Sequence, residues 1–131
     1  MSNGSVKDGG DVEHAMLWTA TMVRLNVVLK PSSPHGVDGL LDALRFVIAG
    51  TRLEPGCQGC STWADPDSTV HYVESWSSEE DVRQHVMSPL FTSLLAIVES
   101  LQAPPHVQFD FVSASRGLDF IAEVRGERFE P

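Results

Sequence analysis

The sequence is short of basic side chains. It has 9 lysines and arginines against 18 aspartates and glutamates, which gives a formal net charge of -9 at pH 7. A protein of this charge repels a phosphate backbone, and no cluster of basic residues offsets the repulsion. We therefore expect no nucleic-acid partner.

Long apolar runs are also missing. An uncharged stretch over residues 87–98 contains Pro89 and falls well short of the roughly 20 apolar residues that cross a bilayer. The first ten residues lack the basic start and the apolar run of a secretory signal. We expect a cytoplasmic protein with no membrane partner, and a flexible tail over residues 1–19.

Cysteine is rare, with only Cys57 and Cys60 in a C-x-x-C spacing. A zinc site needs four ligands, and no second cysteine pair or paired histidines follow. A redox pair usually opens a helix, where the helix dipole lowers the thiol pKa, whereas this pair opens an expected strand. The pattern predicts two reduced, structural thiols and no metal site.

What is present is the composition of one globular domain, with 42% hydrophobic and 21% charged residues in 131. Apolar residues alternate over residues 21–30 and predict a strand with one buried face. Apolar residues at helical spacing follow over residues 37–53, until Glu54-Pro55-Gly56 ends the predicted helix.

Two further strands are predicted over residues 57–64 and 70–76. The turn sequence Asp65-Pro66-Asp67-Ser68 separates them, so they should pair as an antiparallel hairpin.

Two consecutive helices should follow this hairpin. Ser77 and Glu80 have the spacing of a capping box, which predicts a helix start. Ser88 and Pro89 then suit the cap and first position of a second helix, so we expect a bend between the two.

The last predicted elements are strands. Val107, Phe109 and Phe111 alternate with polar residues, and residues 118–125 favour a short fifth strand over a helix. The order β, α, β, β, α, β predicts an α+β, ferredoxin-like fold, an antiparallel sheet with helices on one face. We place this domain at residues 20–115 and expect the extension at 116–131 to contribute its strand to a dimer.

The second face of such a sheet has no helices over it. We expect that face to carry rings such as Tyr72 and Trp76, whose exposure would be costly in a chain this small. A second copy should therefore cover it, which predicts a homodimer.

Four short motifs resemble the antibiotic biosynthesis monooxygenase family. They are Glu54-Pro55-Gly56-Cys57, Glu74-Ser75-Trp76, His85 and Ser88-Pro89-Leu90-Phe91, and the resemblance spans about residues 22–113. It implies a dimeric α/β barrel with a small-molecule pocket between sheet and helices in each subunit. It also implies oxygenases that act on aromatic polyketides or quinols without flavin, haem or metal.

Haem-degrading relatives on the same fold use a tryptophan and a histidine after the third strand. Their places fall at His85 and Leu95 here, so the residue pair is absent and haem degradation is disfavoured. Fold alone does not decide among the remaining activities.

A cofactor-free oxygenase needs polar groups that hold a phenol and a base with a pKa near neutrality. His85 is the first candidate, because its helical spacing aims it at the sheet, where burial should hold it neutral; a structural brace is the alternative. His71 is a second candidate base. The resemblance places a working asparagine near Asn26, with a dimer-interface role as the alternative.

The candidate substrate-binding residues are aromatic: Tyr72, Trp63, Trp76 and Phe91. Packing is the alternative role for the two tryptophans. Glu74 corresponds to a recurrent glutamate of the family, which serves either an interface contact or acid-base chemistry.

Two functions remain open. The first is a cofactor-independent monooxygenase, an oxidoreductase that acts on a small aromatic or quinol-type compound. The second is a dimeric binding or accessory protein that holds a small apolar molecule without turnover.

Overall fold

The computed structural model describes residues 22–126, so the expected tail at 1–19 lies outside the described residues. The described elements follow in the order β1 (Met22–Leu29), α2 (Gly36–Thr51), β2 (Cys57–Ala64), β3 (Val70–Trp76), α3 (Glu79–Val86), α4 (Pro89–Glu99), β4 (His106–Val112) and α5 (Leu118–Arg125). Within residues 22–126 no helix is long and apolar enough to span a membrane.

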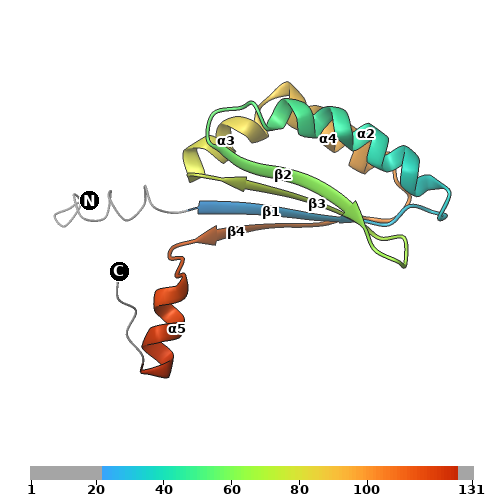
Figure 1. Cartoon of the computed structure of the whole chain (residues 1–131). Helices are drawn as coiled ribbons and strands as arrows, with labels where there is room; N and C mark the ends of the chain where they lie inside the picture. The colour runs from blue at the N-terminus through green and yellow to red at the C-terminus, as the bar shows by residue number, and fades with distance from the viewer. Residues whose placement is uncertain (1–21, 127–131) are drawn as a thin grey trace.

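The four strands form one antiparallel sheet in the order β2-β3-β1-β4. Helices α2, α3 and α4 lie on one face of this sheet (Figure 1). The α+β, ferredoxin-like βαββαβ prediction is therefore confirmed. Strand β4 is an edge strand, and its only neighbour within the described chain is β1.

The core lies between the sheet and these helices. Apolar residues of β1 alternate inward as predicted, and Val23, Leu25 and Leu29 are fully buried. Strand β3 turns Val70, Tyr72, Glu74 and Trp76 toward the same side. The expectation that Tyr72 and Trp76 lie on the uncovered face is wrong, because the pairing register sends them under the helices.

The open face of the sheet instead carries a mixed set of side chains. Asn26 and Val28 of β1 pair in register with Val73 and His71 of β3, and all four side chains are half-buried. Exposure of Tyr72 and Trp76 therefore no longer argues for a partner subunit, and the homodimer stays a prediction.

The helix starts are set by serine caps. Ser78 Oγ accepts a hydrogen bond from the Asp81 backbone N–H at 3.1 Å, so the capping residues lie one position after the predicted Ser77 and Glu80. Ser88 caps α4 through the Phe91 N–H, with Pro89 at the first position as predicted. The two consecutive helices are confirmed.

Residues 118–125 form helix α5, so the predicted fifth strand is wrong and the less favoured helix is correct. Asp119 and Glu123 lie one turn apart, and Arg116 binds both at 2.9 and 3.0 Å. Gly126 ends the helix in the left-handed conformation, with φ of 71°. These local contacts explain why the apolar alternation did not produce a strand.

Candidate functional site

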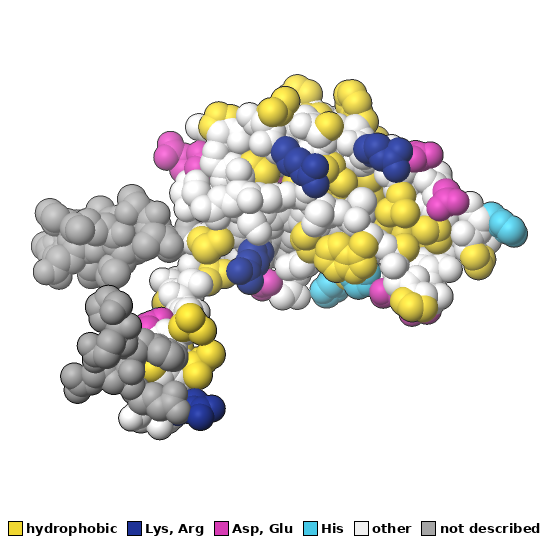
Figure 2. All heavy atoms as spheres, in the orientation of Figure 1, with side chains coloured by type: hydrophobic (Ala, Val, Ile, Leu, Met, Phe, Trp, Pro, Cys, Tyr) yellow, Lys and Arg dark blue, Asp and Glu magenta, His cyan; other side chains and the backbone are white. Residues whose placement is uncertain are grey.

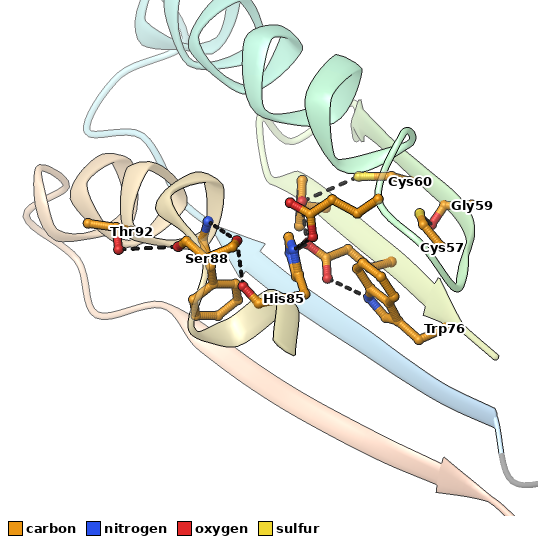
Figure 3. Close-up of polar contacts among 11 residues, drawn as sticks. Cys57, Gly59, Cys60, Trp76, His85, Ser88 and Thr92 are labelled. Carbon is orange, nitrogen blue, oxygen red and sulfur yellow. Dashed lines mark hydrogen bonds and ion pairs between the residues drawn. The ribbon is translucent and has the colours of Figure 1, made fainter. Parts of the chain in front are cut away.

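A buried carboxylate lies at the centre of the space between β3 and α3. Glu74 accepts hydrogen bonds from Tyr72 Oη at 2.5 Å and from Trp76 Nε1 at 2.8 Å, and its Oε2 lies 2.9 Å from His85 Nε2. The alternation of β3 aims Tyr72, Glu74 and Trp76 inward together. His85 of α3 lies beside Trp76 (Figure 3). Glu74 is fully buried, so these contacts replace its water shell.

His85 is held between two carboxylates. Its Nδ1 lies 2.7 Å from Glu54 Oε1, and the imidazole packs against the rings of Trp76 and Phe91. Burial lowers the pKa of His85, but hydrogen bonds and the negative charges of Glu74 and Glu54 outweigh it and raise that pKa overall. The two carboxylates act against the expected neutral imidazole, and sequence reasoning counted the burial but not these two charges.

This arrangement limits the chemistry of His85. Both ring nitrogens already face carboxylate oxygens, and the side chain is 1% exposed. The histidine therefore has no free nitrogen with which to accept a proton from a ligand. It links α3 to β3 through Glu74 and to the connection between α2 and β2 through Glu54.

The cysteines lie at the end of the same network. Both are free, and Cys60 Sγ lies 3.3 Å from Tyr72 Oη. Burial raises the pKa of the Cys60 thiol to about 12, and it also raises the pKa of Cys57. Burial likewise raises the pKa of Tyr72, so the phenol remains protonated as a donor to Glu74. Neither thiol is activated, as the strand position predicted.

The open sheet face carries the other predicted site residues. His71 Nε2 lies 2.6 Å from Asp65 Oδ2, and the imidazole stacks on Trp63 with 5.2 Å between ring centroids. Asn26 belongs to the same face, diagonally across β1 and β3 from His71. The structure therefore separates His71, Asn26 and Trp63 from His85, Tyr72, Trp76 and Phe91 by the thickness of the sheet.

A groove between α3 and β4 is a third feature. The resemblance implied a pocket between sheet and helices, but none of the candidate site residues lines this groove. It has a volume of about 340 Å³, and its apolar lining is Val82, Val86, Met87, Phe109 and Phe111. This size is within the range of small-molecule sites. The signal in the sequence was the inward alternation of Phe109 and Phe111 on a strand that the helices leave partly uncovered.

The charged residues of the groove are Glu79 and Arg83, one turn apart on α3. Arg83 Nη2 and Nε donate to Glu79 Oε2 at 2.6 and 2.7 Å. Val82 forms part of the floor and packs in one cluster with Trp76, which separates the groove from the buried network.

The groove suits a flat apolar ligand with one polar end. Phenylalanine and aliphatic side chains would contact a ring, and the carboxylate and guanidinium would contact a hydroxyl or its anion. Within residues 22–126, no group of three or more histidine, cysteine, aspartate or glutamate side chains is arranged to hold a metal ion.

No protein-family model and no curated protein matches this sequence. Solved structures do match. A conserved protein from Methanosarcina mazei Go1 superposes with a TM-score of 0.64 at 16% identity, over 74% of this chain and 98% of that one. Rv0793 from Mycobacterium tuberculosis superposes with a TM-score of 0.59 at 23% identity, over 68% of this chain and 92% of that one.

A third structure carries a descriptive name, antibiotic biosynthesis monooxygenase. It superposes with a TM-score of 0.58 at 19% identity, over 67% of this chain and 95% of that one. Nearly all of each neighbour is matched, whereas about a quarter to a third of this chain lies outside each match. The chain therefore has the fold of the antibiotic biosynthesis monooxygenase structures.

Proposed function

We propose that this chain is a cofactor-independent monooxygenase that binds a small phenol or quinol in the groove between α3 and β4. The observation that carries the proposal is an apolar slot with a carboxylate and guanidinium pair at its edge. The fold of structures named as antibiotic biosynthesis monooxygenases supports the same reaction class.

The chemistry follows from that lining. The ring lies against Phe109, Phe111 and Met87, and its hydroxyl reaches the Glu79 and Arg83 pair. Glu79 accepts the hydroxyl proton, and Arg83 holds the resulting anion. Deprotonation makes the ring electron-rich enough to pass electrons to dioxygen, an apolar molecule that enters the groove readily.

The reaction balances without an external reductant. A 1,4-dihydroxyarene and dioxygen give a hydroxyquinone and water. One oxygen atom forms a bond to a ring carbon that loses its hydrogen, and the other leaves as water. The substrate supplies all the electrons, which is why the proposal needs no resident redox group.

Binding without turnover is the second candidate function. It is favoured by the exposure of the polar pair, since the Arg83 and Glu79 side chains are 74% and 46% exposed. A carboxylate in water is a weak base for a phenol, and no histidine lines the groove.

The test uses 1,4-dihydroxynaphthalene as a probe, with oxygen uptake and binding measured on the same preparation. Wild-type protein should consume oxygen above the uncatalysed rate, and one atom from labelled dioxygen should appear in the product. Binding without added oxygen uptake would reject the oxygenase and support the second function. Absence of binding would reject both.

Arg83→Gln locates the site. It should weaken binding of the probe about tenfold or more, because it removes a hydrogen bond to a charged group. Arg45→Gln is the matched control, since Arg45 is 77% exposed and pairs with Asp42 on α2, and neither residue lines the groove. Equal effects of the two changes would place the ligand elsewhere.

A further inference from the structure

Helix α5 exposes four large apolar side chains to solvent. Leu118 is 71% exposed and Val124 67%, while Phe120 and Ile121 are each 48% exposed. Figure 2 shows hydrophobic surface on the part of α5 that is visible in that view. Apolar patches of this kind usually mark a contact with another surface.

The helix is nevertheless well formed. Arg116 ties its acidic side together through Asp119 and Glu123, and Gly126 closes its end. Asp119 and Glu123 therefore form one charged, internally paired side of α5, and Leu118, Phe120, Ile121 and Val124 are exposed elsewhere on a surface that also includes Arg125. Such a helix has a face ready for docking before any partner arrives.

The groove also exposes apolar side chains to solvent. It opens beside β4, where Met87 is 87% and Phe111 54% exposed. Helix α5 does not cover the groove of its own chain. It projects from the end of β4 on the side of the sheet opposite α2 and α4 (Figure 1). The groove lies on the other side, because residues of α3 line it.

A second copy of the chain could cover both the apolar side chains of α5 and the apolar lining of the groove. The reach that is needed can be estimated for a second copy whose open sheet face packs on this one, because two sheets packed face to face lie about 10 Å apart. Helix α5 has 8 residues and is about 12 Å long, and the connection through residues 113–117 adds a reach of roughly 16 Å. From the open face, α5 can therefore pass the edge of a second sheet and reach the helix side of that sheet, where the second groove lies.

We propose that α5 is exchanged between two copies of this chain, and that its apolar face closes the groove of the copy it reaches. A two-fold axis makes the contact reciprocal, so each groove receives one helix. The inference rests on the proposed function in one respect: the closed groove is the substrate site, and without the second copy that site stays open to water.

Cross-linking tests the exchange without any substrate. Met87→Cys is combined in turn with Leu118→Cys, Ile121→Cys and Val124→Cys, and each double variant is prepared with and without nitrogen-15. Labelled and unlabelled protein are mixed, left to exchange and oxidised, and the linked peptides are analysed by mass.

Exchange of α5 predicts linked peptides that join a labelled segment to an unlabelled one, as about half of the product for random pairing. Links confined to uniformly labelled or unlabelled peptides would show that α5 folds onto its own chain, and would overturn the inference. Absence of links in all three variants would also overturn it. Met87→Cys with Leu53→Cys controls for collision, because Leu53 is 86% exposed and lies outside α5.

Leu118→Glu and Leu53→Glu separate this inference from the proposed function. Leu118→Glu should give a monomer near the chain mass of 14.3 kDa and lower turnover at least about tenfold, whereas Leu53→Glu should change neither. Mixed links without any turnover would keep the exchange and reject the monooxygenase. Turnover without links would reject the exchange alone.

Discussion

Helix α3 faces two regions that differ in how completely they are filled. Toward β3 it places His85 in a network where both of its ring nitrogens have carboxylate partners. Toward β4 it places Glu79, Arg83 and Val86 along an open groove. The polar groups on the filled side contact one another, so they stabilise the fold and are not free to bind a ligand. The side chains on the open side line a groove that a ligand could occupy.

The comparison also reassigns the histidine that the family resemblance singles out. His85 is the candidate base from the sequence, yet its surroundings raise its pKa and place a carboxylate oxygen at each ring nitrogen. A residue that recurs in a family can therefore serve the fold, and the ligand site can lie on the next face of the same helix.

The largest expected effect comes from breaking the filled side. Glu74→Gln should lower the free energy of unfolding by about 3–5 kcal/mol, because it removes the fully buried carboxylate that pairs with His85 and leaves Glu54 as the remaining carboxylate partner. Urea unfolding at pH 7 measures this value.

Glu79→Gln is the control on the groove side of α3. Its partner Arg83 is largely exposed, and a surface pair at this spacing contributes about 0.3–0.5 kcal/mol. Similar losses for Glu74→Gln and Glu79→Gln would mean that the two sides of α3 do not differ as the structure indicates.

A pH dependence should come next in size. The pKa of His85 is raised in the folded protein above its ordinary value of 6.5. Its stabilising contribution is therefore complete below about pH 6.5 and is lost as pH rises through the folded value. The free energy of unfolding should fall over this interval by at most about 1.4 kcal/mol per pH unit for this group.

Unfolding curves of wild type and His85→Gln across this pH range isolate the effect. The variant should be less stable and should lack this part of the slope, while its turnover per folded molecule stays near wild type because His85 lies outside the groove. His35→Gln, at an exposed histidine, is the control. A large loss of turnover in folded His85→Gln would restore His85 as a catalytic candidate.

Local periodicity was enough to predict the sheet and the helices that cover it. Alternation in β1 and β3 and the Ser88-Pro89 start of α4 are short-range signals, and the structure contains each of them. Local periodicity does not predict which face of a strand points to the helices. Whether Tyr72 points to the helices depends on the register between β1 and β3, which residues far apart in the chain decide.

The site was less predictable for the same reason. Glu54 reaches His85 from 31 positions away, so the second carboxylate that raises the histidine pKa has no local signal. The groove needs α3 and β4 side by side, and neither segment alone indicates a cavity. Helix α5 was missed because Phe120, Ala122 and Val124 also fit strand alternation, and the charges that favour a helix lie one turn apart.

The smallest expected effect tests whether the filled side stays closed. Cys60 is buried at the end of the network, and its pKa of about 12 against an ordinary 9.0 implies about 10³-fold less thiolate than a free thiol at pH 8. Iodoacetamide should therefore modify the half-buried Cys57 first and reach Cys60 only when the protein unfolds. Mass analysis of the native protein over time measures both rates, and urea-unfolded protein gives the upper limit. Replacing both cysteines with serine should leave turnover per folded molecule unchanged, because neither thiol lines the groove. Modification of native Cys60 as fast as Cys57 would show that the network opens to solvent, and loss of turnover in the folded double variant would show that the cysteines take part in the chemistry.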